Sequence, residues 1–426
     1  MEQAYQRALN FVHNMPAFSS VPGVFRIKRL LQYLGNPQEQ LKFVHIAGTN
    51  GKGSTAAMCA AAFQEAGYKT GLYISPFIID FRERFQIDGE MISKHEFVEL
   101  YIQVRDAYER ITAEGLECNE YDFITALAFL YFRRNHCDIV CLEVGLGGDA
   151  DATNIIPPPE AAVITKISYD HMKVLGNTIQ QIAKAKAGII KHGSPCICYP
   201  DQTEDVLEVI MQTCATVQSP LILPNMYQTE ILRCDENGTI FLYGGREYHL
   251  KLLGKHQIDN AITAIETLRN LKTIQLTEQQ IANGIAKTTF PARMEILQHD
   301  PIVVLDGAHN PNGFVALAKS IRMFQCSPKI GVCGVLKDKS YQQELALLDG
   351  VLDHLVVTNV DSPRGLAAEE LKNVAEGNHF QVSLSDYPQQ AYQQAIKLAG
   401  KQGGVFIFGS LFLAADLRKY LQKEKL

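Results

Sequence analysis

Apolar residues are distributed along the chain in two arrangements that alternate with each other. The first is a short, nearly continuous apolar run, which is typical of a strand buried in a parallel sheet. Such runs occupy residues 43–46, 70–74, 138–144, 160–167, 302–305, 330–335, 355–360 and 404–408.

In the second arrangement, apolar residues recur every three or four positions, as on one face of an amphipathic helix. Helices are predicted over residues 4–17, 25–34, 54–66, 93–114, 123–132, 179–190 and 256–271, with another after Thr277. Ser93 stands three residues before Glu96, which is the spacing of a capping box at a helix start. Strands that alternate with helices in this way predict an α/β fold.

The first strand leads into the glycine-rich loop Gly48-Thr-Asn-Gly-Lys-Gly53, and an alanine-rich helix follows. The N–H groups at a helix N-terminus have no helical partner, and together with the helix dipole they bind anions. Lys52 could reach the β- and γ-phosphates of a nucleotide, while Ser54 or Thr55 could place a hydroxyl on Mg²⁺. Position 46 is isoleucine and position 53 is glycine, so the standard phosphate-loop pattern is not fully met and an ordinary turn is the alternative.

Two later strands end in residues that can bind metals or phosphate groups. Glu143 closes a buried run, where a carboxylate is costly unless it meets a cation, and the Mg²⁺-side carboxylate of a phosphate-loop enzyme belongs there. A capping or salt-bridged glutamate is the alternative. Asp170 and His171 follow the next strand, at the sheet edge where ligands bind in open α/β folds. Physical reasoning alone predicts that Lys184 and Lys186, in the helix after it, are solvated.

The alternating pattern changes in three places. Residues 77–89 are rich in charge and aromatic side chains and are expected to form a long functional or mobile loop. Residues 195–250 contain short strands with turn sequences, which predicts a small peripheral β region. The pattern breaks again at 290–296. The sequence therefore predicts a P-loop N-terminal domain (1–295) with a mostly parallel sheet flanked by helices, and a smaller α/β C-terminal domain (296–426).

Composition narrows the classes of function. The 426 residues are 46% hydrophobic and 20% charged, as in soluble globular proteins of two or three domains. The formal charge of −6 argues against a surface devoted to nucleic acids. The ten cysteines lack zinc spacing, and Cys196 and Cys198 are expected to be buried, reduced thiols. With no signal-peptide or membrane-spanning pattern, we expect a cytoplasmic protein with no nucleic-acid or membrane partner.

Several motifs in one order resemble the folylpolyglutamate synthase/dihydrofolate synthase family, within the Mur-type ATP-dependent amide ligases. The resemblance covers nearly the whole chain. The motifs lie at residues 34–37, 48–54, 75–76, 81–84, 143–148, 151–154, 170–171, 186–189, 256–260, 291–293, 306–311 and 409–411.

This resemblance implies an enzyme that joins L-glutamate to the γ-carboxylate of a reduced folate, or to dihydropteroate. In that family ATP phosphorylates the acceptor carboxylate, the glutamate amine attacks the acyl phosphate, and ADP and phosphate leave. ATP is the expected cosubstrate and Mg²⁺, at two sites, the expected cofactor. We expect a monomer whose active site lies in the interdomain cleft, so that domain closure gates catalysis.

The resemblance also implies roles for individual residues. Lys186 matches a position that is carbamylated by CO₂, which would convert a cation into an anion beside the metal. Arg293 would meet the phosphates, Asp306 the ribose, and Gln257 with Asn260 the base. The implied catalytic residues are Lys52, Lys186, His171 and His309, and the implied metal ligands are Ser54, Glu143, His171 and Lys186 as its carbamate. ATP binding is implied for Thr49, Asn50, Gly51, Lys52, Gly53, Ser54, Thr55, Gln257, Asn260, Arg293, Asp306 and His309, and folate or pterin binding for Ser75, Phe77, Arg84, Tyr121 and Asp151.

Three departures from the family pattern concern the acceptor. Asp149 stands where arginine is usual, Tyr121-Asp-Phe123 only loosely matches an aromatic–acid segment, and Phe77 stands where histidine is common. Asp151, which serves the dihydropteroate site in bifunctional members, is retained. Activity on dihydropteroate is therefore left open.

Two other functions compete with this interpretation. Another Mur-type amino-acid ligase with a non-folate carboxylate acceptor, such as a cell-wall precursor, normally has threonine at position 53 and a further N-terminal domain. The second is a nucleotide-gated binding module that uses ATP or GTP as a switch. A GTPase would need an Asn-Lys-x-Asp sequence to read the base, and that sequence is absent. A degenerate ligase would be expected to lose Lys52, Glu143 or His309, and all three are present.

Overall fold

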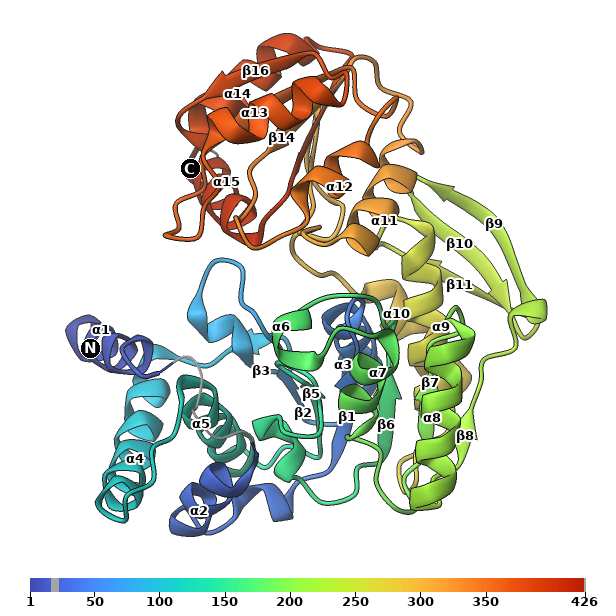
Figure 1. The fold of residues 1–426 in the computed structure, drawn as a ribbon. Coiled ribbons are helices and arrows are strands. Elements are labelled where there is room, and N and C mark those ends of the chain that lie inside the picture. The colour runs from blue at the N-terminus through green and yellow to red at the C-terminus, as the bar shows by residue number, and fades with distance from the viewer. Residues whose placement is uncertain (17–22, 425–426) are drawn as a thin grey trace. The chain divides into compact units, whose positions relative to one another are not determined.

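The computed structural model describes residues 1–16 and 23–424, in two compact units (Figure 1). Residue 17, the end of the first predicted helix, lies outside the described residues. Unit 1 comprises Met1–Phe77, Phe81–Gln228 and Asp259–Thr288, and unit 2 comprises Ile78–Asp80, Thr229–Ile258 and Thr289–Leu426. The sequence analysis places the domain boundary between residues 295 and 296. In the structure the chain enters unit 2 for the last time at residue 289, and residues 229–258 also belong to unit 2.

Unit 1 is built on an eight-stranded sheet of order β4-β3-β2-β5-β1-β6-β7-β8. The six strands from β2 to β8 in this order are parallel, while β3 and β4 are antiparallel additions at one edge. The central strands are buried along their whole length, as their continuous apolar runs predict. The bounds are β1 Phe43–Ala47, β2 Thr70–Tyr73, β3 Phe85–Ile87, β4 Glu90–Met91, β5 Ile139–Glu143, β6 Ala161–Ile164, β7 Cys196–Cys198 and β8 Leu221–Ile222.

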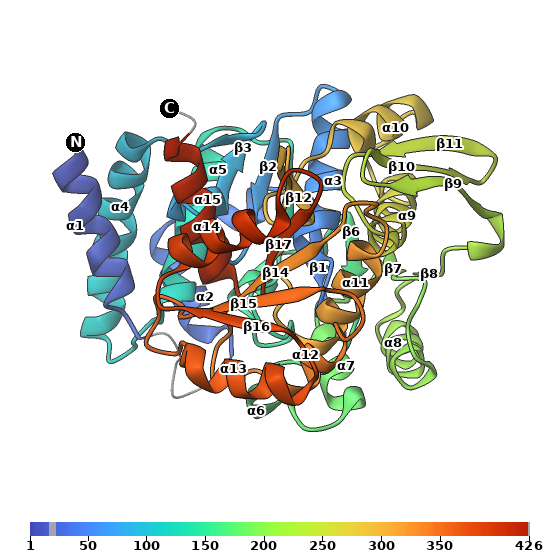
Figure 2. The same ribbon diagram turned by 90° about the horizontal axis from the view of Figure 1, so that it is seen from above.

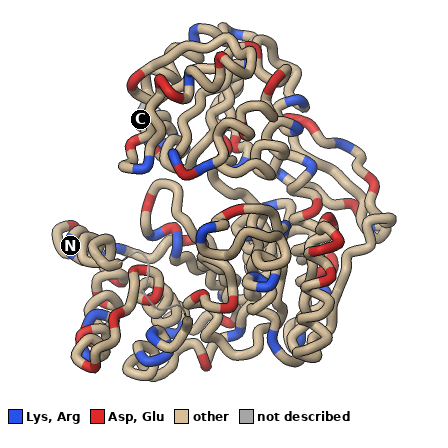
Figure 3. Tube along the Cα trace, viewed as in Figure 1, with Lys and Arg blue, Asp and Glu red and all other residues tan. Residues whose placement is uncertain are grey.

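Helices cover this sheet, and α1 packs along α4 at one end (Figures 1 and 2). The α1–α4 contact is aromatic, with the rings of Tyr5 and Phe97 edge to face at 5.4 Å. Ser93 accepts a hydrogen bond from Glu96 N–H and caps α4, as predicted. Basic and acidic positions are interspersed along α4 (Figure 3). The bounds are α1 Glu2–His13, α2 Phe25–Tyr33, α3 Lys52–Glu65, α4 Lys94–Ala113, α5 Glu120–Arg134, α6 Met172–Leu175, α7 Ile179–Ala187, α8 Glu204–Val217, α9 Lys255–Arg269 (which begins in unit 2) and α10 Glu278–Lys287.

Two expectations about irregular regions were wrong in part. Residues 77–89 include a 3₁₀ turn, Phe81–Arg84, and strand β3, because buried Phe85 and Ile87 alternate with Gln86. The separate β region expected over residues 195–250 is confirmed over 229–250, but not over 195–228, because β7 and β8 extend the main sheet and α8 lies between them in the chain. The buried residues of α8 recur at helical spacing, and they pack with buried Cys196 and Cys198. They are Val206, Ile210 and Cys214.

Unit 2 contains a six-stranded sheet of order β12-β13-β17-β14-β15-β16, in which only the β12–β13 pair is antiparallel. Figure 2 shows β17, β14, β15 and β16 in succession. Neighbouring residues of β13 belong to different apolar clusters, Val304 to one and Val303 and Leu305 to the other, so both faces of the sheet are covered. The bounds are β12 Glu295–His299, β13 Ile302–Leu305, β14 Lys329–Cys333, β15 His354–Thr358, β16 Val382–Ser385 and β17 Gly404–Phe408.

The remaining elements of unit 2 are five helices and a three-stranded antiparallel sheet of order β11-β10-β9, within the described residues. The helices are α11 Pro311–Ile321, α12 Tyr341–Ala346, α13 Ala368–Gly377, α14 Pro388–Ala399 and α15 Leu411–Glu424, and the strands are β9 Thr229–Asp235, β10 Gly238–Tyr243 and β11 Arg246–Leu250. In the described part of the chain, no helix combines the length and apolar character that a membrane span requires. The fold is α/β in both units, as predicted.

Candidate nucleotide and metal site

The glycine-rich loop connects β1 to the first turn of α3, and two of its glycines are required by close approaches. Gly51 caps α3 with φ 88°, and a Cβ there would lie 2.3 Å from Asn260 Oδ1. A Cβ on Gly48 would lie 1.8 Å from Thr165 Oγ1. Only glycine allows the loop to pass so close to these side chains. Asn260, expected near the base, is a buried side chain packed against this loop.

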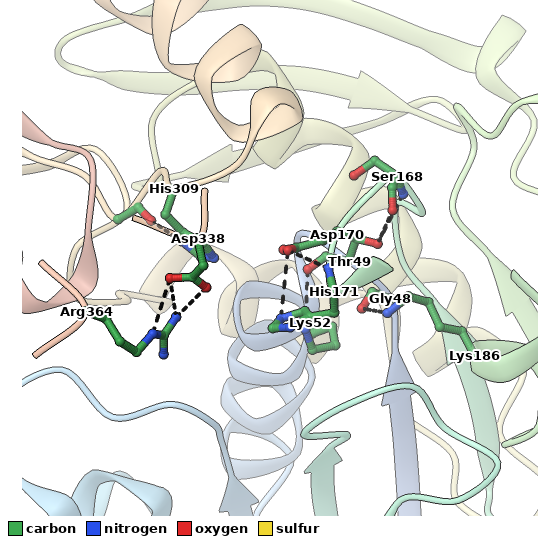
Figure 4. A network of polar contacts seen from close by, with 11 residues as sticks. Gly48, Thr49, Lys52, Ser168, Asp170, His171, Lys186, His309, Asp338 and Arg364 are labelled. Atoms are coloured by element: carbon green, nitrogen blue, oxygen red, sulfur yellow. Dashed lines mark hydrogen bonds and ion pairs between the residues drawn. The ribbon is translucent and has the colours of Figure 1, made fainter. Parts of the chain in front are cut away.

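The loop is tied to the segment that follows β6. The N–H groups of Thr49 and Asn50 donate to Lys166 O, at 2.8 and 3.2 Å. Thr49 Oγ1 donates to Ser168 O at 3.0 Å and accepts from Ser168 N–H at 3.1 Å. Figure 4 shows this contact beside Asp170 and His171, which continue the same segment. The glycine-rich loop and the segment bearing Asp170 and His171 are therefore held together.

Lys52 and Glu143 meet in unit 1. Lys52 Nζ lies 3.7 Å from Glu143 Oε1 and 3.3 Å from Thr49 O. The other carboxylate oxygen of Glu143 accepts the N–H of Ser75 at 3.0 Å. Glu143 is buried, so a cation and a backbone donor compensate its charge as the sequence argument requires. The contact alone is also compatible with a salt-bridged glutamate.

The prediction that Lys186 is solvated was wrong, although Lys184 is exposed. Lys186 is only 5% exposed, and its Nζ donates to Gly48 O at 2.7 Å (Figure 4). Burial, reinforced by the nearby positive charge of Lys52, lowers the pKa of Lys186 to about 7, against the opposing effect of Asp170. The helix turns Lys186 inward because Ala183 and Ala187 share its buried face. A substantial fraction of this amine is uncharged at neutral pH.

His171 lies in a different environment from Lys186. Its backbone is left-handed, with φ 50°, and its side chain is 53% exposed. Asp170 Oδ1 accepts the His171 N–H at 2.8 Å and lies 3.9 Å from its Nε2. The imidazole is thus accessible to a ligand and lies beside a carboxylate.

The donor set suits Mg²⁺ bound together with a nucleotide. The described residues contain no group of three or more His, Cys, Asp and Glu side chains that could hold a metal ion alone. Mg²⁺ keeps several waters and uses one or two carboxylates plus substrate phosphates, so a preformed cage is not needed. Ser54, two residues after Lys52 on α3, and Glu143 offer the oxygen ligands that Mg²⁺ prefers. Thr55 Oγ1 is buried without a hydrogen-bond partner among the described residues.

Three of the residues predicted to bind folate come together. Arg84 Nη1 donates to Ser75 Oγ at 3.0 Å, and its guanidinium lies 5.2 Å from the Phe77 ring centroid and 5.4 Å from that of Phe81. Tyr121 is close to the Glu143 strand, since a Cβ on Gly145 would lie 2.4 Å from its Cζ. A cation beside two aromatic rings and a hydroxyl can recognise an aromatic ring with an anionic tail.

Asp151 has a structural role that the sequence analysis missed. Its carboxylate accepts the N–H groups of Leu146 and Thr153, both at 2.9 Å, and the Thr153 hydroxyl at 2.5 Å. His45 Nε2 lies 2.9 Å from the same hydroxyl. Burial raises the pKa of Asp151. A buried histidine in a strand that ends at a phosphate loop was the available signal for this network. Asp149, by contrast, is exposed, and its carboxylate accepts the N–H of Ala150 at 2.8 Å.

Unit 2 gathers a second set of predicted residues. Asp306 Oδ2 accepts Met294 N–H at 2.9 Å, and its Oδ1 accepts Ala308 N–H at 2.8 Å. Arg293 Nη1 donates to Ala292 O at 2.9 Å. His309 Nδ1 lies 2.8 Å from Gly307 O, which indicates that this nitrogen carries the proton.

Two residues at the start of α9, His256 and Gln257, also belong to unit 2. His256, to which the sequence gave no role, is half-buried, and the loss of hydration lowers its pKa while Asp306 opposes the change. Gln257 is a buried side chain beside it in the chain. His256 is therefore an additional member of the unit 2 set, and its position within a motif was the only signal.

The comparisons with known proteins agree along the whole chain. The Mur ligase middle domain family matches residues 46–268, and the Mur ligase glutamate ligase domain family matches residues 292–411. The dihydrofolate synthase/folylpolyglutamate synthase of Bacillus subtilis is 35% identical, over 99% of this chain and 100% of that protein.

Solved structures give the same result. Folylpolyglutamate synthase of Mycobacterium tuberculosis, complexed with ADP and AMPPCP, superposes with a TM-score of 0.90 at 31% identity, over 98% of both chains. Escherichia coli FolC in complex with DHPP and ADP superposes with a TM-score of 0.88 at 26% identity, over 99% of this chain and 98% of that one.

Proposed function

Because this chain belongs to the folylpolyglutamate synthase/dihydrofolate synthase family of Mur-type ligases, we propose that it uses ATP to join L-glutamate to the γ-carboxylate of a reduced folate. Dihydropteroate is the second acceptor proposed. The observation that carries the proposal is Lys52, at the start of α3, within 3.7 Å of the buried carboxylate of Glu143. We expect a cytoplasmic monomer.

The residues of unit 1 act on the transferring phosphate. Lys52 and the N–H groups at the start of α3 offset the negative charge that develops as the γ-phosphoryl group leaves ADP for the acceptor carboxylate. The glutamate amine then attacks the acyl carbon, and the carbon–oxygen bond to phosphate breaks. Mg²⁺, held by Ser54 and Glu143 with His171 serving a second ion, would supply further charge neutralisation when bound.

Lys186 is proposed to act as its carbamate. The ammonium first loses a proton, and the uncharged amine then attacks CO₂. A carbon–nitrogen bond forms, one C=O π bond opens onto oxygen and a second proton is released, so that an anion replaces the original cation. The pKa of about 7 and the burial of Lys186 support this role, because a buried ammonium beside Lys52 is electrostatically unfavourable. Lys186→Ala should nearly abolish turnover, and short carboxylic acids should restore part of it. Unchanged turnover in the variant would remove Lys186 from the mechanism.

We propose nucleotide-binding roles for Arg293, Asp306, His309 and Gln257 of unit 2 and for Asn260 of unit 1. Arg293 offers its guanidinium to the phosphates and Asp306 retains acceptor capacity for the ribose, while Gln257 and Asn260 contribute to binding the base. His309 is assigned to the reacting end. In the folate set, Arg84 with Phe77 suits the aromatic and anionic parts of a folate, and Asp151 supports that site by fixing its loop.

The test is ADP release from ATP, Mg²⁺ and L-glutamate, measured separately with tetrahydrofolate and with dihydropteroate. Release with both acceptors would establish both activities and show that Phe77 and Asp149 are tolerated. Release with tetrahydrofolate alone would restrict the enzyme to polyglutamylation. If neither acceptor responds, the folate assignment fails in favour of another Mur-type ligase with a non-folate carboxylate acceptor.

A further inference from the structure

The segment that carries Arg293 holds two strained residues. Ala292 has φ 51° and Met294 has φ 47°, so both neighbours of Arg293 are left-handed although neither is glycine. The left-handed conformation is unfavourable for residues with a Cβ and persists only where surrounding contacts enforce it. Both residues are buried. The direction of the Arg293 side chain therefore depends on whatever holds its two neighbours.

Two carboxylates hold them. Glu295 Oε2 accepts the N–H of Ala292 at 2.9 Å, and Asp306 Oδ2 accepts the N–H of Met294 at 2.9 Å. The carbonyl of Ala292 in turn accepts Gly307 N–H and Arg293 Nη1, both at 2.9 Å. The peptide groups of this turn thus link the backbone strain directly to the guanidinium of Arg293.

Arg418, far along the chain on α15, holds Glu295 in place. Its Nη2 donates to Glu295 Oε1 at 2.8 Å, and its Nε lies 3.2 Å from Oε1 and 3.1 Å from Oε2. The two side chains are 20% and 22% exposed, so the pair is largely shielded from solvent. Glu295 also pairs with Leu305 in the β12–β13 ladder, next to Asp306. Arg418 therefore binds both oxygens of Glu295, and Oε2 also accepts the Ala292 N–H, so the guanidinium fixes the carboxylate that holds Ala292.

We propose that Arg418 and Glu295 are positioning residues that keep Arg293 in the conformation that binds the nucleotide phosphates. The proposal rests on the proposed function, since it takes Arg293 to be a phosphate ligand. Neither residue needs to touch ATP. The Arg418–Glu295 pair acts as a clamp on the turn. When the clamp is lost, the turn populates other conformations, and the affinity for ATP falls in proportion to the fraction of molecules whose turn is still competent to bind.

The test is calorimetric titration of the full chain with the analogue AMPPCP and Mg²⁺. Arg418→Met should weaken binding about tenfold, and Glu295→Gln should act in the same direction, as expected when the competent fraction falls to roughly one tenth. Arg269→Met is the matched control, because Arg269 pairs with Glu278 through two 2.8 Å contacts in unit 1. The control should bind the analogue as the native chain does.

A second substitution separates positioning from general damage. Glycine adopts a left-handed conformation without strain, so Ala292→Gly added to Arg418→Met should restore most of the lost affinity. Unchanged binding in both clamp variants, or a double variant no better than Arg418→Met, overturns the proposal. Arg293→Met separates the phosphate-binding role proposed for Arg293 from the positioning role proposed for Arg418 and Glu295. If it leaves binding intact, the phosphate role of Arg293 fails and the clamp fails with it, whereas loss in Arg293→Met with native binding in both clamp variants overturns the clamp alone.

Discussion

Lys186→Met is expected to stabilise the folded chain at pH 7 while it removes turnover. The ordinary pKa of lysine is 10.5, and burial lowers that of Lys186 to about 7. This difference corresponds to roughly 5 kcal/mol at 1.36 kcal/mol per pH unit. Methionine has similar length and no charge to bury, but it forfeits the 2.7 Å hydrogen bond to Gly48 O, worth about 1.5–3 kcal/mol. We expect a net gain of about 2 kcal/mol.

The pH dependence of the free energy of unfolding tests independently whether Lys186→Met stabilises the chain. Between pH 7 and 10.5 the unfolded chain keeps a proton on Lys186 that the folded chain has lost. The free energy of unfolding of the native chain therefore rises with pH across this window. Methionine does not titrate, so its advantage should be greatest at or below pH 7 and should fall as the pH rises. Towards pH 10.5 the cost of burying the charge is gone, so the lost hydrogen bond to Gly48 O should leave the methionine variant less stable than the native chain by about 1.5–3 kcal/mol.

The assay is urea unfolding followed by far-ultraviolet circular dichroism at pH 7 and pH 10, in buffers freed of CO₂ so that no carbamate forms. Lys184→Met is the matched control, since Lys184 is an exposed lysine of the same helix. It should change stability by less than about 0.5 kcal/mol. A Lys186→Met variant that is less stable at pH 7, or equally stabilised at both pH values, would refute the reasoning.

Three further substitutions have defined outcomes. Gly284→Ala should cost about 1–3 kcal/mol in thermal unfolding and weaken ATP binding, because its Cβ would lie 2.3 Å from the Cα of Ala62 on α3; an unchanged melting temperature would contradict this packing. Asp151→Asn should cost about 1–3 kcal/mol in urea unfolding and raise the KM for the acceptor, since its amide would place a donor against the N–H of Leu146 or Thr153. Native stability and KM in this variant would argue against the network. Ser93→Ala should cost about 1 kcal/mol with turnover unchanged, whereas Ser93→Asp should keep the cap.

The sequence predicted the strands and the strand–glycine-loop–helix unit well because both depend on local patterns. Continuous apolar runs identify strands buried on both faces, and the glycines before α3 mark a loop that only glycine can form. The period of α8 was equally local, with Val206, Ile210 and Cys214 in helical register. It was missed because the short apolar runs on either side of it suggested strands throughout.

The buried polar contacts could not be predicted in the same way. Lys186 donates to Gly48, which is 138 residues away, and Arg418 pairs with Glu295 across 123 residues. Nothing in the local sequence of either helix distinguishes these side chains from solvated ones. The left-handed conformation of Ala292 and Met294 is likewise imposed by tertiary contacts, since neither residue type favours it.

The most direct test of the proposed ligation follows one oxygen atom. Tetrahydrofolate labelled with ¹⁸O in its γ-carboxylate is incubated with the chain, ATP, Mg²⁺ and L-glutamate, and the released phosphate is analysed by mass spectrometry. An acyl phosphate predicts that each phosphate released in turnover carries one oxygen from the labelled carboxylate, and that amide product forms in equal amount. Unlabelled phosphate would show that ATP is hydrolysed by water, and it would contradict phosphorylation of the acceptor carboxylate.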